Sequence, residues 1–213
     1  MCQWRWRSAS RWSTAARGHS YKSKPPSLAR YCIHSFAHLE RKQNGPRMVY
    51  DGRAIANFVL DVCEDVGRPI SNLALQKIVY FCHVWSLIEL KTPLVKHSFE
   101  AWEFGPVLPY LYREFKSFDN SSITSRAKSF DPLSGSSRIV DYEFDSTTQE
   151  FLEKVVSFYS QLRASDLVKL SHAKGGPWDE TWNHAGVVNP GMKIKEDSIV
   201  SFYSHAFVPF SLQ

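Results

Sequence analysis

The chain has 213 residues, of which 43% are hydrophobic, 14% aromatic and 22% charged. This length and composition suit one globular domain whose core needs neither disulfides nor metal, and they exclude a chain that is disordered throughout. The net charge of +5 is unevenly divided. Residues 1–47 hold ten basic side chains and one acidic one, whereas residues 48–213 hold sixteen basic and twenty acidic ones. The domain is therefore expected to be mildly acidic, which disfavours nucleic acid as its partner.

Residues 1–47 precede the first patterned helix and are expected to be a disordered basic extension. They lack helical periodicity and the apolar run of a secretory signal. Three explanations stay open: a start codon placed upstream of a true start at Met48, an Arg- and Ser-rich transit peptide, or a basic arm that touches nucleic acid. The first is favoured because Met48 leads directly into a helix, so residues 48–213 are taken as the domain.

The domain carries no sequence signal for a membrane span, a metal site or a cofactor site. Lys77, His83 and Glu89 interrupt its most hydrophobic stretch. The four cysteines lack metal-ligand spacing, and the nucleotide-binding, serine-hydrolase and zinc-protease motifs are absent. We therefore expect a cytoplasmic protein that uses no metal and no cofactor and does not enter a membrane.

Two amphipathic helices are predicted at the start of the domain. In the first, apolar residues recur at three- and four-residue spacing from Ile55 to Val66, and Gly67 supplies a left-handed stop. In the second, Ser71 is the predicted N-cap, and the following residues as far as position 88 are apolar on nearly every face. A helix of that kind must be covered by its neighbours, so it is predicted to be the centre of the core.

A short strand and an aromatic helix are predicted next. Residues 97–104 alternate apolar with polar side chains, and Gly105 and Pro106 are predicted to shape the turn that follows. Pro109 suits the first position of a third helix. Residues 117–137 are rich in Ser, Asn and Asp and predict a surface loop, after which residues 138–144 alternate again and are expected to form a second strand.

The last third of the domain is predicted to be helical. Ser146 and Gln149 form a capping box ahead of a fourth helix, and a further short helix through residues 167–170 is expected to end at Gly175. Trp178 and Trp182 suit one face of another short helix, and a last helix runs through residues 199–202. The predicted fold is mainly α (α+β): a compact multi-helix domain with a small two-stranded β element.

Three blocks of sequence, at residues 75–85, 99–115 and 170–182, resemble in order and spacing those of the Panacea domain of SocA-like antitoxins. The resemblance covers about residues 50–205 and leaves out the basic extension and the serine-rich loop. It implies structural roles for the motif residues, which are Leu75, Tyr80, Phe81, Trp85, Glu100, Ala101, Gly105, Pro106, Val107, Pro109, Phe115, Gly176, Pro177 and Trp178.

The resemblance implies a bacterial or prophage-borne antitoxin rather than an enzyme. Such a protein neutralises an unrelated protein toxin by direct binding, either by occluding its active surface or by delivering it to a cellular protease. Composition and periodicity predict only the helical domain, so this function rests on the resemblance. The residues predicted to contact the partner are Gln76, Lys77, His83, Trp102, Tyr110, Tyr112, His172 and Trp182.

Several of these residues also have a purely structural explanation. Gln76 and Lys77 on a buried helix can reach outward to solvent or cap a neighbouring carbonyl group. Most tryptophans in a domain of this size lie in its core, and Trp182 is the preferred exposed candidate.

Two other functions are weighed against the antitoxin. The first is an enzyme of unrecognised type that uses His83, Glu100 or His172, although a buried histidine that is hydrogen-bonded within the core is commoner than a catalytic one. The second is a DNA-binding regulator of its own operon, for which only the basic extension could supply the contact.

Overall fold

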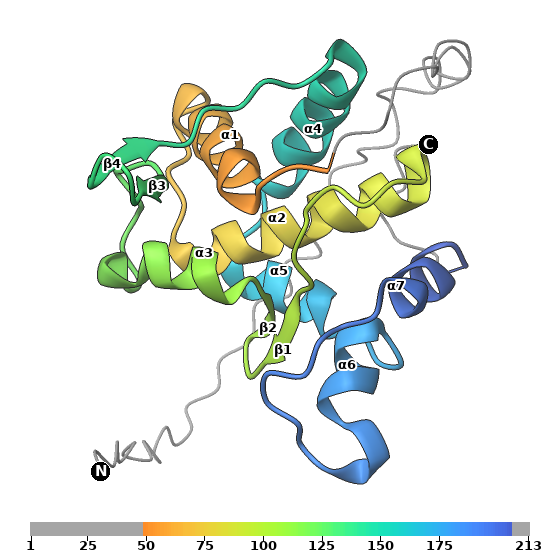
Figure 1. The fold of residues 1–213 in the computed structure, drawn as a ribbon. Helices are drawn as coiled ribbons and strands as arrows, with labels where there is room; N and C mark the ends of the chain where they lie inside the picture. The colour runs from red at the N-terminus through yellow and green to blue at the C-terminus, as the bar shows by residue number, and fades with distance from the viewer. Residues whose placement is uncertain (1–48, 206–213) are drawn as a thin grey trace, which may run out of the picture. The chain divides into compact units, whose positions relative to one another are not determined.

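Helix α2 (Asn72–Trp85) is the element around which most of the other helices pack, and the π-helix η2 (Ser86–Leu90) continues it (Figure 1). Thirteen of its fourteen residues are buried, as expected for a helix that is apolar on nearly every face.

The computed structural model describes residues 49–205. The basic extension, the expected domain boundary at Met48 and residues 206–213 lie outside the described residues.

By length and composition alone, the segment Asn72–Leu90 is apolar enough to cross a membrane. Its most apolar window is 78% buried within the domain, and both Lys77 and His83 are buried. The core helix of a globular protein has the same length and composition, and this burial assigns the segment to the protein core.

Helices α1 (Gly52–Asp65) and α4 (Ser146–Tyr159) pack on α2 and on each other, and each begins at an aspartate (Figure 1). The Arg53 N–H donates to the Asp51 carboxylate at 2.8 Å, and the Thr148 N–H donates to the Asp145 carboxylate at 3.0 Å. The predicted capping box at Ser146 is therefore wrong by one residue. Asp145 takes the N-cap position, because its carboxylate satisfies the free N–H groups of the first turn.

The predicted ends of the first two helices are confirmed in position. Gly67 has a φ of 66° directly after the C-cap residue Val66, which is the left-handed conformation that ends a helix. Ser71 occupies the N-cap of α2, but its side chain makes no capping hydrogen bond.

Strands β1 (Glu100–Trp102) and β2 (Gly105–Val107) form an antiparallel hairpin whose turn lies at Glu103 and Phe104. The prediction that Gly105 and Pro106 form the turn is therefore wrong, since both lie within β2. Residues 191–194 run along the other side of β1. There the Ala101 N–H donates to the Met192 carbonyl and the Ile194 N–H donates to the Phe99 carbonyl, both at 2.8 Å.

A second antiparallel hairpin is formed by strands β3 (Lys128–Asp131) and β4 (Ser136–Ile139). The expected surface loop at residues 117–137 thus contains a strand. The strand expected at residues 138–144 begins at position 136 and pairs with β3 within the serine-rich segment. The predicted mainly helical fold with a small β element is confirmed, and the described residues have two small two-stranded sheets where one was expected.

The remaining helices are short. Pro109 opens α3 (Pro109–Glu114), as predicted, and the 3₁₀ turn η3 (Lys116–Phe118) follows it. Helix α5 (Ala164–Ser171) ends before the predicted Gly175, because the chain turns at His172. Helix α6 (Pro177–Trp182), the 3₁₀ turn η4 (His184–Gly186) and α7 (Glu196–Tyr203) complete the described chain.

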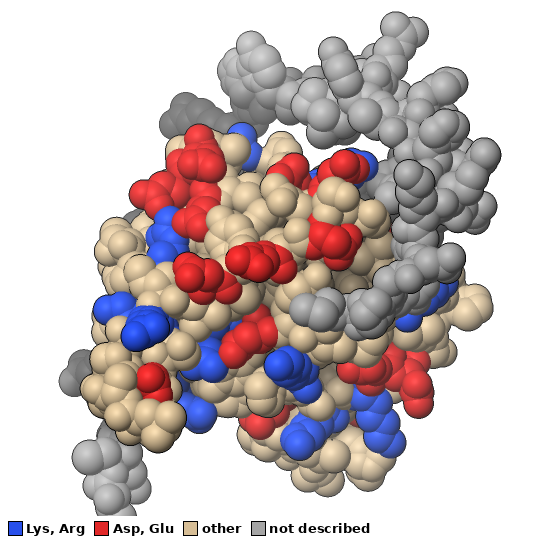
Figure 2. Space-filling view, turned by 45° about the horizontal axis from the view of Figure 1, so that its top comes forward, with Lys and Arg blue, Asp and Glu red and all other residues tan. Residues whose placement is uncertain are grey.

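Acidic side chains are concentrated on the face formed by α1, α4 and the segment that joins β4 to α4 (Figure 2). Residues 49–66 and 140–160 hold nine acidic side chains against two basic ones, whereas the other described residues hold eleven acidic and fourteen basic ones. The exposed acids of this face are Glu64, Asp65, Asp141, Glu143, Asp145, Glu150 and Glu153. Such a face repels a phosphate backbone.

The base of the β3–β4 hairpin is attached to α1 by one buried amide. Asn57, which is 1% exposed, accepts a hydrogen bond from the Ala127 N–H at 2.7 Å. Its side-chain NH₂ donates to the Ala127 carbonyl at 3.1 Å and to the Val140 carbonyl at 2.8 Å. One side chain therefore satisfies three backbone groups where the two strands separate.

Replacing Asn57 by alanine leaves these groups without their partners inside the protein, and an unpaired buried polar group costs about 1 to 3 kcal/mol. We expect Asn57→Ala to lower the free energy of unfolding by at least that amount in denaturant titrations. Gln149→Ala, which removes an exposed amide, serves as the control and should change it by less than about 0.5 kcal/mol. Equal effects of the two substitutions would contradict the assignment.

Candidate functional site

Lys77 lies on α2 with its side chain fully inside the domain. It is 0% exposed, and its amine donates a hydrogen bond to the Pro106 carbonyl of β2 at 2.8 Å. Burial lowers the pKa of Lys77 to about 7, because the charged form loses its hydration. The first motif block is thereby joined to the second through a buried amine.

Gly105 lets the β2 backbone rest directly on this amine. Its φ is 102°, a conformation that glycine adopts without strain. A Cβ atom at this position would lie 2.8 Å from the Cε atom of Lys77 and 2.6 Å from the hydroxyl oxygen of Ser171. Glycine is therefore required here by both the backbone angle and the lack of space.

Residues of the third motif block pack around Lys77 as well. The His172 ring stacks on Trp178 with ring centroids 3.6 Å apart, and the Trp178 indole N–H donates to the Trp102 carbonyl at 2.8 Å. Burial, and next the charge of Lys77, lower the pKa of His172. The His172 Nε2 atom is buried without a hydrogen-bond partner among the described residues. All three sequence blocks thus meet around Lys77.

Gln76, the neighbour of Lys77, forms hydrogen bonds that hold the start of α3 in place. Its side-chain oxygen accepts a hydrogen bond from the Leu108 N–H at 3.0 Å. Its NH₂ group donates to the Asn72 side-chain oxygen at 3.2 Å, and the Asn72 NH₂ group donates to the Tyr112 carbonyl at 3.0 Å. Gln76, which was predicted to contact the partner, is 1% exposed, so its polar atoms form hydrogen bonds inside the domain.

His83 is likewise 2% exposed and holds the chain that follows η2. Its Nδ1 atom accepts hydrogen bonds from the N–H groups of Leu94 and Val95 at 3.3 and 3.4 Å. Burial lowers the pKa of His83 to about 4, so the ring is neutral at pH 7. The carboxylate of Glu196, 3.7 Å from Nε2, therefore faces an uncharged ring at a distance too long for a hydrogen bond.

The candidate enzyme residues do not form one constellation. His83 contacts residues 94 and 95 and the Phe99 ring, whereas His172 lies against Trp178 and near Lys77. The Glu100 carboxylate accepts the Trp102 indole N–H at 3.0 Å. Among residues 49–205 there is also no group of three or more His, Cys, Asp or Glu side chains placed to hold a metal ion.

Aromatic side chains pack against each other at the surface next to the residues that contact Lys77. Trp102 packs on Tyr112 with ring centroids 5.1 Å apart, and Trp178 stacks on Trp182 at 5.7 Å. The loop after α6 is tied to this group, since the Asn189 N–H donates to the Trp182 carbonyl at 2.8 Å. We call the resulting surface the aromatic ledge; it comprises Trp102, Phe104, Tyr112, Trp182, Val187, Val188 and Met192.

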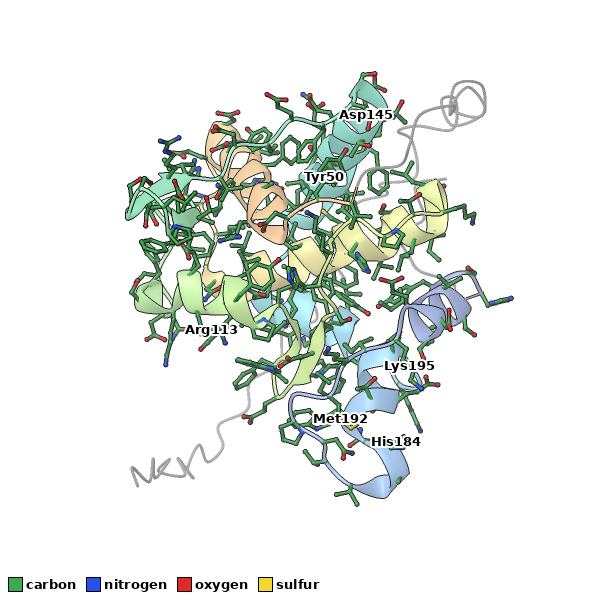
Figure 3. All side chains as sticks on the ribbon, viewed as in Figure 1. Tyr50, Arg113, Asp145, His184, Met192 and Lys195 are labelled. Carbon is green, nitrogen blue, oxygen red and sulfur yellow. The ribbon has the colours of Figure 1, made fainter. Side chains whose placement is uncertain are left out.

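Four residues of the aromatic ledge are strongly exposed for apolar side chains: Phe104 is 60%, Val187 63%, Val188 53% and Met192 42% exposed. Figure 3 shows Met192 and His184 at the end of the domain that lies away from Tyr50 and Asp145, so the Met192 part of the ledge is remote from the N-cap of α4. A group of exposed apolar side chains of this kind is typical of a protein-binding surface.

The structure separates the eight predicted contact residues into two groups. Gln76, Lys77 and His83 are buried, and the Tyr110 hydroxyl accepts the Gly52 N–H at 3.1 Å at the start of α1. Trp102, Tyr112 and Trp182 are partly exposed on the aromatic ledge, while the partly exposed His172 stacks beneath it.

The four strongly exposed ledge residues, Phe104, Val187, Val188 and Met192, were not predicted from the sequence. Their sequence signal was weak: each is an apolar residue in a turn or loop segment, where no periodicity distinguishes a surface side chain from a core one.

Comparisons with known proteins agree with the motif blocks. Residues 75–179 match a family model described as "Antitoxin SocA-like, Panacea domain". The chain is 44% identical over 145 residues to "Antitoxin SocA" of Caulobacter vibrioides (strain NA1000 / CB15N), an alignment that covers 68% of this chain and 77% of that protein. No solved structure matches the chain.

The buried amine predicts a pH dependence of stability. The pKa of Lys77 is about 7 in the folded domain and about 10.4 in an unfolded chain. Between these pH values the unfolded chain binds a proton that the folded domain lacks, so this residue opposes folding less as the pH rises. The unfolding free energy of the unchanged protein, relative to that of Lys77→Met, should rise by up to about 1.4 kcal/mol per pH unit from pH 7 to 9. Parallel curves for the two proteins would rule this out.

Proposed function

Because the chain belongs to the family of SocA-like antitoxins with a Panacea domain, we propose that it neutralises a protein toxin by binding it directly. The observation that carries the proposal is the aromatic ledge, where the half-buried Trp102, Tyr112 and Trp182 lie on or next to segments that carry exposed apolar side chains. Aromatic side chains give a large contact area for little loss of conformational entropy, and they dominate the binding energy of many protein interfaces.

The proposed partner is a protein rather than a nucleic acid. The acidic face on α1 and α4 opposes binding of a phosphate backbone, and the ledge offers apolar contacts rather than a row of basic side chains. The proposed location is the cytoplasm, in keeping with the buried free thiols of Cys63 and Cys82. The domain proposed to carry the activity is residues 48–213.

Neutralisation can follow either of two routes once the toxin is bound. In the first, the antitoxin covers the active surface of the toxin, which then persists in an inactive complex. In the second, the antitoxin delivers the toxin to a cellular protease. The lifetime of the toxin in cells with and without this protein and the protease distinguishes the routes, because only delivery makes toxin loss depend on both.

The direct test uses the product of the adjacent small open reading frame as the partner. Co-expression with the unchanged protein should restore growth and yield a stable complex. Phe104→Ser combined with Val188→Ser should weaken the complex by at least about tenfold, which corresponds to about 1.4 kcal/mol. The measurement is the dissociation constant of the purified pair.

A matched control is available at the two ends of α1, where Val49 is 36% and Val66 52% exposed. Val49→Ser combined with Val66→Ser should bind within about twofold of the unchanged protein. If the ledge variant binds as tightly as this control, the toxin does not contact the ledge. If the unchanged protein neither binds nor rescues, direct neutralisation of that partner is wrong.

A further inference from the structure

The chain between α6 and the segment that runs along β1 forms a loop with an apolar tip. Val187 is 63% and Val188 53% exposed, and every residue from position 183 to 188 is exposed. Residues 181–192 contain no Lys, Arg, Asp or Glu. Figure 1 shows the loop projecting beyond α6 at one end of the domain. We call residues 183–191 the valine loop, since its two valines present an uncharged apolar tip to solvent.

Both ends of the valine loop are fixed to the domain. At its start, Trp182 is the last residue of α6 and stacks on Trp178 with ring centroids 5.7 Å apart. At its end, the Gly191 N–H donates to the Ala101 carbonyl and the Ala101 N–H donates to the Met192 carbonyl, both at 2.8 Å. The tip between these ends is exposed, so its shape depends on hydrogen bonds made within the loop.

Asn189 makes the hydrogen bonds that close the valine loop. Its backbone N–H donates to the Trp182 carbonyl at 2.8 Å. Its side-chain NH₂ group donates to the His184 carbonyl at 3.1 Å and also to the Val187 carbonyl. Asparagine side chains commonly hold a turn by bonding nearby backbone groups in this way. One residue thus joins the end of the loop both to its start and to its tip.

The backbone of the valine loop includes a conformation that is unfavourable in isolation. Ala185 has a φ of 55° and a ψ of 27°, which is the left-handed region that residues with a Cβ atom rarely adopt. Neither this conformation nor the exposure of two valines stabilises the fold. Local strain and exposed apolar side chains that persist together in a folded domain are typical of binding sites.

We propose that Asn189 is a positioning residue for toxin binding, which holds the valine loop in the shape that lets Val187 and Val188 enter an uncharged apolar pocket of the toxin. A loop that is already closed loses little conformational entropy when a complex forms, so it binds more tightly than a loop that must first be ordered. The inference rests on the proposed function, because it takes the toxin as the partner and adds the chemistry of its pocket.

The first test compares Asn189→Ala with Asn183→Ala in the full chain, with the product of the adjacent small open reading frame as the partner. Asn183 lies next to the tip, but its side chain donates to the Asp179 carboxylate of α6 and bonds no carbonyl of the loop. Asn189→Ala should raise the dissociation constant by about tenfold and Asn183→Ala by less than about twofold. Equal dissociation constants for the two variants would overturn the proposal.

Hydrogen exchange in the free protein tests whether Asn189 sets the shape of the loop. The closed loop is reported by the Val187 N–H, which donates to the His184 carbonyl at 3.2 Å, and by the backbone N–H at position 189. Both should exchange at least about tenfold faster in Asn189→Ala than in the unchanged protein. The Ala101 N–H should exchange at the same rate in both, because the end of the loop stays attached to β1. Unchanged exchange at both loop positions would contradict the role of Asn189.

A double-mutant cycle distinguishes the positioning of the two valines from a general structural role. Val187→Ser combined with Val188→Ser should raise the dissociation constant by about tenfold. Adding Asn189→Ala to this pair should raise it by less than about twofold more, since the side chains that Asn189 positions are already lost. If the two effects multiply instead, Asn189 acts on binding by another route and the proposal is wrong.

The outcomes separate this inference from the function on which it rests. If the unchanged protein forms no complex, the proposed function fails, and the inference fails with it. If the complex is weakened by Phe104→Ser combined with Val188→Ser but not by Asn189→Ala, only the positioning role is wrong. If Asn189→Ala weakens the complex but the double valine variant does not, the tip of the loop enters no pocket and the proposal is overturned.

Discussion

The hydrogen bond from the Lys77 amine to the Pro106 carbonyl stands at the point where three distant parts of the chain meet. Burying an amine is unfavourable unless it is hydrogen-bonded, and this one is satisfied only if β2 lies directly on α2. Gly105 permits that approach because a side chain there would overlap both Lys77 and Ser171. This single contact region positions the β1–β2 hairpin, the end of α5 and the start of α6.

The position of the aromatic ledge follows from the same contact. Trp178 reaches across to the Trp102 carbonyl and stacks between His172 and Trp182, so the indole rings are held by the cluster beneath them. Polar groups of the motif blocks therefore work inside the domain, while the aromatic and apolar side chains next to them form its surface. A rigid support of this kind reduces the entropy that a partner must overcome on binding.

Much of the fold was predictable because its signals are local. The apolar periodicity of α1 and α2, the stop at Gly67 and the first position of Pro109 each depend on neighbouring residues alone. The errors arose where distant residues decide the outcome. Gly105 and Pro106 are residues typical of a turn. They lie in a strand instead, where the Pro106 carbonyl accepts a hydrogen bond from the buried Lys77 amine. The serine-rich segment contains a strand because Asn57, about 70 positions earlier, holds its base.

The site was predictable only in part for the same reason. The polar residues of α2 were predicted to contact the partner because polar side chains usually face outward. Whether they are buried depends on how many other elements cover the helix. The spacing of residues within the helix does not reveal how many elements cover it. The exposed side chains of Phe104, Val187 and Val188 were missed because an apolar residue in a loop has no periodicity that reveals which way it faces.

The most direct test of the central contact compares two glycines, since Gly105 and Gly135 both have positive φ but only Gly105 lacks space for a Cβ atom. Gly135→Ala should cost about 1 to 2 kcal/mol of unfolding free energy through its backbone angle alone. Gly105→Ala should cost about 1 to 3 kcal/mol more, because Lys77 and Ser171 must move, and binding of the proposed toxin partner should weaken with it. Equal losses of stability and unchanged binding would show that the Lys77 contact does not organise the domain.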